Sequence, residues 1–119
     1  TNPLNFATFD SLVVPADSSA AAEIQAKLAD SVVLKAFNTN FAGTLASRQL
    51  GGVQTTVLVA GDSDEAKGEL LAAVQAGGVS AIDAGALSRA RELEAIGFLQ
   101  LTLAAREQLG WTAGFAVVR

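Results

Sequence analysis

The chain has 119 residues and a formal net charge of −4; 50% of its residues are apolar and 17% are charged. This length suits one ordinary domain rather than a multidomain enzyme, and the apolar content excludes intrinsic disorder. Because cysteine and histidine are absent, disulfides, thiolate or imidazole metal sites and Cys- or His-based nucleophiles are excluded as well. We therefore predict no metal site and no catalytic side chain.

The placement of charged and apolar residues also excludes some classes of binding partner and some cellular locations. The eight Lys and Arg residues are scattered, whereas nucleic-acid binding needs them clustered, so no nucleic-acid partner is predicted. No uncharged apolar stretch reaches the roughly 20 residues of a membrane helix, and the N-terminus lacks the layout of a signal peptide. We expect a cytoplasmic protein with no membrane contact. Since methionine is absent and the sequence begins at Thr1, we also expect a fragment of a longer protein.

The first part of the chain predicts a loop, a helix and a strand. Residues up to Pro15 are expected to form an ordered loop. Ser18 and Ser19 are favourable N-cap residues, and the apolar spacing after them predicts a helix that ends near Asp30. The next run, Val32 to Phe37, is short, mostly apolar and partly β-branched, which predicts a strand buried on both faces.

The middle of the chain alternates helices and strands. Gly51-Gly52 is expected to stop a short helix, and Asp62 is expected to cap a longer one, because Glu65 stands three residues later as in a capping box. In chain order, the pattern predicts a helix over residues 41–47, a strand over 55–60, a helix from Asp62 to Gly77-Gly78 and a strand over 79–83.

A long helix is predicted from Leu87 to Leu109, followed by a short last strand from Ala113 to Val118. Between Ala95 and Ala105 only two polar residues interrupt the apolar ones. A helix that is apolar nearly all round is buried on more than one side, and the other elements are too few to cover it. We therefore predict that another chain or an absent part of this one covers it, and we expect a homodimer formed through Ala95 to Leu109.

The alternation of strands and helices indicates an α/β fold. Asn38, Thr39 and Asn40 follow the first strand, at the carboxyl end where open α/β sheets bind ligands. The alternative is that these side chains only satisfy the backbone of the loop. Asp83 ends the third strand in the same way, and for this residue a role in the turn is favoured.

Two further patterns concern anions. A helix start at Ser88 with Arg89 and Arg91 could hold an anion, or the arginines could pair with Glu92 and Glu94 along the helix. No two glycines are two residues apart anywhere in the chain, so G-x-G-x-x-G is absent, and there is no Walker sequence either. The chain carries no phosphate-binding loop of its own.

Five groups of residues stand in a distinctive order. They are Thr1-Asn2-Pro3-Leu4; Ser19 to Leu28 ahead of Val33-Leu34-Lys35-Ala36-Phe37-Asn38-Thr39; Val59-Ala60-Gly61-Asp62; Asp83-Ala84-Gly85; and Leu87-Ser88-Arg89-Ala90-Arg91-Glu92-Leu93-Glu94. In this order they resemble the C-terminal half of the NADP-dependent reductases of the deazaflavin coenzyme F(420). The resemblance covers nearly the whole chain. The same architecture occurs in the reductase domain of six-helix membrane metalloreductases and in dinucleotide-binding oxidoreductases of unknown substrate.

The resemblance implies the C-terminal portion of a Rossmann-like sheet, with three to four strands, flanking helices, a long C-terminal helix and a short last strand. Residues 1–119 would form a single α/β unit, the second half of a Rossmann-type domain, with no internal boundary. In the family the first half holds the pyrophosphate of NADP. The implied sites are Asn2 and Pro3 for the NADP cofactor, and Asn38, Thr39, Asn40 and Phe41 for the deazaflavin.

The activity that the resemblance implies is hydride transfer between the nicotinamide of NADP and a deazaflavin. In such a reaction the cofactors supply the chemistry, and the protein supplies proximity and orientation. This chain would form the substrate side and the dimer interface of the oxidoreductase, and it would be inactive alone. Two alternatives stay open: a non-enzymatic oligomerisation or interaction module, and a family member that uses a flavin or ferric acceptor.

Overall fold

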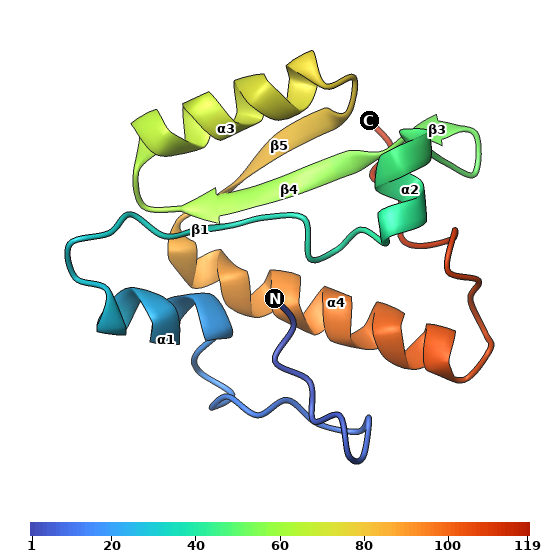
Figure 1. Ribbon diagram of the computed structural model, residues 1–119, viewed down its shortest axis with the longest axis horizontal. Helices are drawn as coiled ribbons and strands as arrows, with labels where there is room; N and C mark the ends of the chain where they lie inside the picture. The colour runs from blue at the N-terminus through green and yellow to red at the C-terminus, as the bar shows by residue number, and fades with distance from the viewer.

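The computed structural model describes residues 1–119, which form a small sheet with helices on both faces (Figure 1). The sheet has the strand order β1-β4-β5, where β1 is Leu34–Lys35, β4 is Thr56–Gly61 and β5 is Ser80–Gly85. β4 and β5 are parallel, whereas β1 is antiparallel to β4. α3 (Asp64–Ala76) covers one face, and α1 (Ala20–Lys27) and α4 (Ala90–Ala105) lie on the other. The predicted α/β fold is confirmed.

The core lies around β4, the central strand. Val57 and Val59 are completely buried and pack with Val74 of α3 and Ala81 of β5. Burial of such a valine side chain stabilises the fold by about 1.5–3 kcal/mol. A second, smaller cluster forms on the other side of the sheet, from Ala21, Leu87 and Ala90. These two clusters fix α3 and the α1–α4 layer on opposite sides of the strands.

Serine side chains cap the N-termini of α1 and α3, and only the first of these caps was predicted. Ser19 caps α1 as predicted, since its Oγ accepts the backbone N–H of Ala22 at 3.0 Å. The predicted cap of α3 is wrong: Ser63, not Asp62, accepts the N–H of the first turn, from Ala66 at 3.2 Å. Asp62 instead accepts the N–H of Leu87 at 2.9 Å, because its side chain reaches across to the segment that follows β5.

The predicted first strand, Val32 to Phe37, is largely wrong. Only Leu34–Lys35 pairs with β4, and Val32 and Phe37 are 63% and 42% exposed, so the run is not buried on both faces. The reason lies in the backbone of Phe37, whose φ of 64° is in the left-handed region and turns the chain out of the strand.

The predicted last strand, residues 113–118, is absent, because this segment pairs with no other strand. Its backbone bonds to a side chain instead: the N–H of Phe115 donates to Oε1 of Gln100 in α4 at 3.3 Å. The C-terminal segment therefore lies against the long helix rather than extending the sheet.

A hairpin that the sequence pattern did not predict follows α2 (Ala42–Ser47). It consists of β2 (Gln49–Leu50) and β3 (Val53–Gln54), which are antiparallel. Gly51 and Gly52 form its turn with φ values of 56° and 91°, a tight turn that requires positive φ at both central residues. The glycine pair thus makes a hairpin, while α2 already ends at Ser47.

The long helix is shorter than predicted. It begins with one turn of 3₁₀ helix, η1 (Leu87–Arg89), and α4 ends at Ala105. Its second half is buried on one side only, since Gly97 and Gln100 are buried but Ile96 and Leu99 are 37% and 51% exposed. None of the helices is both long and apolar enough to cross a membrane.

Candidate functional site

Two of the predicted site residues, Asn2 and Asn38, are hydrogen-bonded to each other. Asn2 donates through Nδ2 to the backbone carbonyl of Asn38 at 3.1 Å, and Asn38 donates through Nδ2 to Oδ1 of Asn2 at 2.8 Å. Nδ2 of Asn38 also donates to the carbonyl of Leu93 in α4 at 2.7 Å. The structure therefore brings together one residue predicted to bind the cofactor and one predicted to bind the substrate, and it fastens both to α4.

Gly97 makes this arrangement possible. It is buried in α4, and a Cβ atom there would lie 2.3 Å from Oδ1 and 2.9 Å from Cγ of Asn2. Separations under 3.0 Å do not occur at a real Cβ atom, so the amide of Asn2 occupies the space that any other residue would fill. A glycine inside a helix weakens it by about 1 kcal/mol relative to alanine, and here the close approach of Asn2 requires it.

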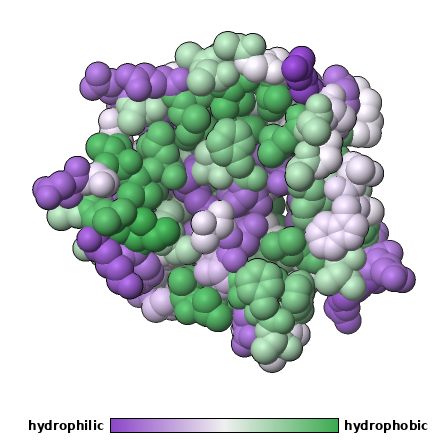
Figure 2. Space-filling model, in the orientation of Figure 1, coloured by the Kyte–Doolittle hydropathy of each residue, from purple (hydrophilic) through white to green (hydrophobic).

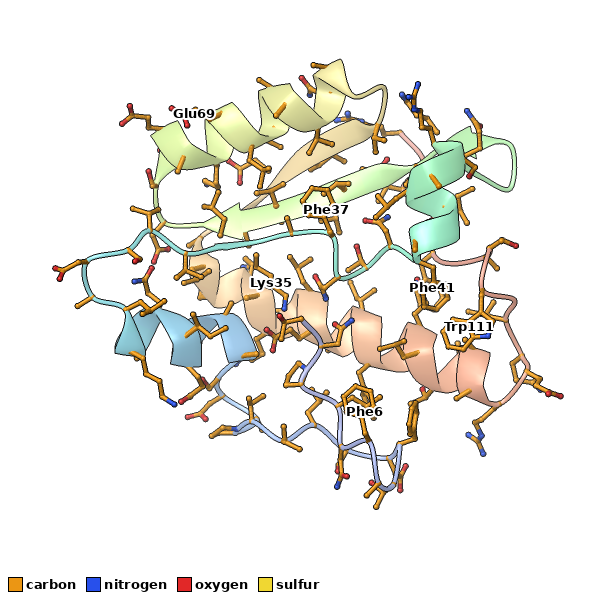
Figure 3. All side chains as sticks on the ribbon, viewed as in Figure 1. Phe6, Lys35, Phe37, Phe41, Glu69 and Trp111 are labelled. Atoms are coloured by element: carbon orange, nitrogen blue, oxygen red, sulfur yellow. The ribbon has the colours of Figure 1, made fainter.

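A buried ion pair lies beside the two asparagines. Lys35 of β1 and Glu94 of α4 are 4% and 1% exposed, and Nζ of Lys35 is 2.9 Å from Oε1 of Glu94. Nζ also donates to the carbonyl of Thr1, the residue before Asn2. Figure 2 shows a polar area in the middle of the face that is turned to the viewer, with apolar surface around it. Lys35 is labelled in the corresponding part of Figure 3.

Glu94 has a second role, because it accepts backbone hydrogen bonds from the start of α1. Its Oε2 accepts from the N–H of Ala20 at 2.8 Å, and its Oε1 accepts from Ala21 at 3.2 Å. A carboxylate at a helix N-terminus is favoured by the helix dipole and by the free N–H groups there. One buried carboxylate thus links α1, β1 and α4.

The other predicted site residues lie around this pair. Pro3 is buried, and its carbonyl accepts the N–H of Val13 at 2.8 Å. Thr39 is buried as well. Asn40 points to the start of β4 and donates through Nδ2 to the carbonyl of Thr56 at 3.0 Å. Contact of these residues with a cofactor or a substrate stays a prediction.

Phe41, the last predicted site residue, is part of an aromatic pair. It begins α2, and its ring centroid lies 5.1 Å from that of Trp111. The side-chain amide oxygens of Asn38 and Asn40 are buried without a hydrogen-bond partner. The segment from Asn38 to Phe41 therefore combines unused amide acceptors with an aromatic surface. It offers no group that could act as a general acid or base.

The arginines at the start of α4 pair with acids rather than leaving a free anion site. Arg89 and Arg91 both contact Oε1 of Glu92, at 3.3 and 3.2 Å. A hydrogen bond from its own backbone N–H lowers the pKa of Glu92 below its usual range, and Arg91 lowers it further. Glu94 does not take part as predicted, because it is buried with Lys35. The interpretation as surface ion pairs is favoured.

Asp83 acts in the turn, as the sequence favoured. Its Oδ1 accepts the N–H of Gly85 at 2.7 Å, and Oδ2 lies 2.9 Å from Nζ of Lys67. The Gly85 hydrogen bond, followed by Lys67, holds the pKa of Asp83 below its usual value. The bond to Asp83 raises the pKa of Lys67, which Asp64 also contacts at 3.2 Å. This cluster joins α3 to the end of β5.

Sequence reasoning missed four residues that build the site: Lys35, Glu94, Gly97 and Trp111. One signal was available for Lys35, because a lysine inside an apolar strand run needs a buried partner. Glu94 was considered as a partner of an arginine along its helix, and no local pattern distinguishes it from Glu92. The roles of Gly97 and Trp111 depend on contacts between segments far apart in the chain.

Comparison with known proteins supports the fold. No protein-family model and no curated protein matches the chain. Among solved structures, it is similar to a "putative F420 dependent NADP-reductase" from Arthrobacter sp. FB24, with a TM-score of 0.85 and 24% sequence identity. The similarity covers 99% of this chain and 55% of that protein, so the chain spans about half of the neighbour's length. At this identity the likeness shows a shared fold, and it agrees with the predicted C-terminal portion of a reductase fold.

Proposed function

We propose that this chain forms the acceptor side of an NADP-dependent oxidoreductase that transfers a hydride between nicotinamide and a deazaflavin coenzyme of the F420 type. One observation carries the proposal. The fold shared with the Arthrobacter protein extends over 99% of the chain, and within it Asn2 and Asn38 are joined at α4. The resemblance implies Asn2 for the NADP cofactor and Asn38 for the deazaflavin, so the proposal expects the two ring systems to meet near this pair.

The chain lacks the glycine-rich turn that holds the pyrophosphate of NADP in dinucleotide-binding folds. Phosphate binding needs free backbone N–H groups at a glycine-rich turn or a helix N-terminus. In this structure Ser19 and Glu94 occupy the N-terminus of α1, and Ser63 occupies that of α3. No two glycines have the spacing of the dinucleotide fingerprint. We therefore expect the chain alone to be inactive and assign it no step that involves this group.

The role left to the chain is to position the acceptor. Hydride transfer needs two flat rings face to face with water excluded, and it needs no acid or base from the protein. Asn38 is held by three hydrogen bonds, to Asn2 and Leu93. Because these hydrogen bonds fix the side chain of Asn38, it can orient the acceptor ring without a change in its own conformation.

The test compares the chain alone with the same chain joined to the part of the Arthrobacter protein that lies outside the shared region. NADPH binding and F420 reduction are measured for both. We expect both activities in the fusion protein only, and a loss of F420 reduction with retained NADPH binding in its Asn38→Ala variant. Tight NADPH binding by the 119-residue chain would refute the proposal. A preference of the fusion protein for flavin or ferric iron would replace the deazaflavin as acceptor.

A second proposal concerns oligomerisation, and the exposed apolar side of α4 favours it. Ile96 and Leu99 are 37% and 51% exposed on adjacent turns. We propose a homodimer through residues 95–109, as part of the enzyme or as the chain's whole role. Light scattering of the wild-type chain and of Leu99→Glu tests it, with Val32→Glu as a control at another exposed apolar residue. The dimer should be lost only in Leu99→Glu, because burial of an unpaired carboxylate in the interface has a high free-energy cost. A wild-type monomer at micromolar concentration would exclude this interface. A cytoplasmic location likewise stays a proposal.

A further inference from the structure

We propose that Trp111 forms, together with Phe41, an aromatic wall against which the flat ring of the acceptor stacks. This inference rests on the proposed function and deepens it, because it assigns a ring-binding residue in the C-terminal segment. The starting observation is the pairing of the two rings, whose centroids are 5.1 Å apart with planes inclined by 52°. Figure 3 labels the two rings, which lie against each other.

Trp111 presents much of its surface to solvent, although it is the largest apolar side chain in the protein. It is 58% exposed, while its neighbour Phe41 is partly buried. Its role is therefore not to fill the core. An exposed indole with one ring neighbour retains surface on which a second flat ring can stack, and stacking on aromatic side chains tolerates any flat heteroaromatic ring.

The segment that carries Trp111 is held at two places. At the residue after Trp111, a Cβ atom at Gly43 of α2 would lie only 3.1 Å from Cγ2 of Thr112, so the chain passes close over the start of that helix. Further along the segment, Phe115 donates its N–H to the buried side chain of Gln100. The backbone that carries Trp111 therefore contacts both α2 and α4, and a backbone that is ordered before binding reduces the ordering that binding requires.

The wall adjoins the predicted acceptor residues directly. Phe41 follows Asn38, Thr39 and Asn40 in sequence, and the amide of Asn40 is fixed to Thr56. A ring stacked on the wall would therefore lie next to a segment that carries two amide oxygens without a hydrogen-bond partner, on Asn38 and Asn40. Flat rings with polar edges, such as deazaflavins, match this combination of aromatic face and amides.

The experiment uses the full chain and coenzyme F420. Because Trp111 is the only tryptophan, quenching of its emission reports binding by the wild type. Absorption of the deazaflavin reports binding by the variants. Trp111→Leu keeps the apolar bulk and removes the aromatic ring, whereas Trp111→Phe keeps a ring. The matched control is Phe6→Leu, since Phe6 is 72% exposed and pairs only with Phe9. Circular dichroism checks that each variant is folded.

We expect Trp111→Leu to weaken F420 binding about tenfold, as the loss of one stacking contact does, and Trp111→Phe to restore most of it. Phe6→Leu should bind like the wild type. If Trp111→Leu binds normally while Asn38→Ala does not, the inference is wrong and the proposed function stands. If Trp111→Leu unfolds, the indole is a core residue and the inference is equally wrong. If the wild type does not bind F420 at all, both fail.

Discussion

Replacement of Gly97 by alanine should destabilise this protein, although alanine is the better helix former. In an open helix position the change would stabilise by about 1 kcal/mol. Here the new Cβ would lie 2.3 Å from Oδ1 of Asn2, so the amide of Asn2 must move away. It then loses the two hydrogen bonds that join it to Asn38, each of which contributes about 1 kcal/mol. The balance is a net loss of about 1 kcal/mol.

The protein offers a matched control for this effect. Gly68 lies inside α3, and a Cβ atom there would meet nothing within 4 Å. Gly68→Ala should therefore show the helix gain alone, about 1 kcal/mol of added stability. The free energy of unfolding of both variants can be measured by urea denaturation, followed by circular dichroism and by the emission of the single tryptophan.

A double-mutant cycle isolates the contact itself. In an Asn2→Ala background the clash is absent, so Gly97→Ala should become stabilising, with a coupling energy of about 2 kcal/mol between the two positions. If Gly97→Ala stabilises the protein containing Asn2 as much as Gly68→Ala does, Asn2 does not pack on α4. The joining of Asn2 and Asn38 at α4 would then be refuted.

Two further predictions concern buried and paired charges. Glu94→Ala should reduce the free energy of unfolding by about 3–5 kcal/mol, because it leaves Lys35 buried without a partner. In urea denaturation, the double variant with Lys35→Met should recover much of this loss. If it recovers none, the pairing of Lys35 with Glu94 is contradicted. The folded pKa of Asp83 is lowered below 3.8, so its stabilising effect is complete above that pH and is lost as the pH falls through the folded pKa. Asp83→Asn should therefore weaken the dependence of the free energy of unfolding on pH at the acid end, as measured by urea denaturation at several pH values. Asp10→Asn, at an exposed position, should leave this dependence unchanged. If the two variants show the same dependence on pH, the role of Lys67 and Gly85 is contradicted.

Local sequence patterns predicted those elements whose signals lie within a few residues. Ser19 was recognised as a cap because its partner is three residues away. The strands β4 and β5 were predicted, over residues 55–60 and 79–83, because these are short and mostly apolar runs between loop signals. The order of five weak motifs then indicated the α/β reductase fold, which the structural neighbour supports.

The errors arose where distant contacts decide the structure. Nothing near Phe37 predicts a left-handed backbone, and residues 113–118 form no strand because Gln100, in another element, takes their backbone N–H. For the candidate site, Asn2 and Asn38 could be named but their mutual hydrogen bonds could not. Glu94 carries the same functional group as Glu92, and only the three-dimensional arrangement makes one buried and the other partly exposed.

The hydrogen bonds of Glu94 also constrain the order in which the protein can fold. Its partners Ala20 and Lys35 lie 74 and 59 residues earlier in the chain. During synthesis, the start of α1 and the amine of Lys35 are made long before the carboxylate that neutralises them. Contacts of such high sequence separation are slow to form, because a long loop must close first. The first third of the chain must therefore wait, with a cation and free N–H groups exposed to water, until α4 is made.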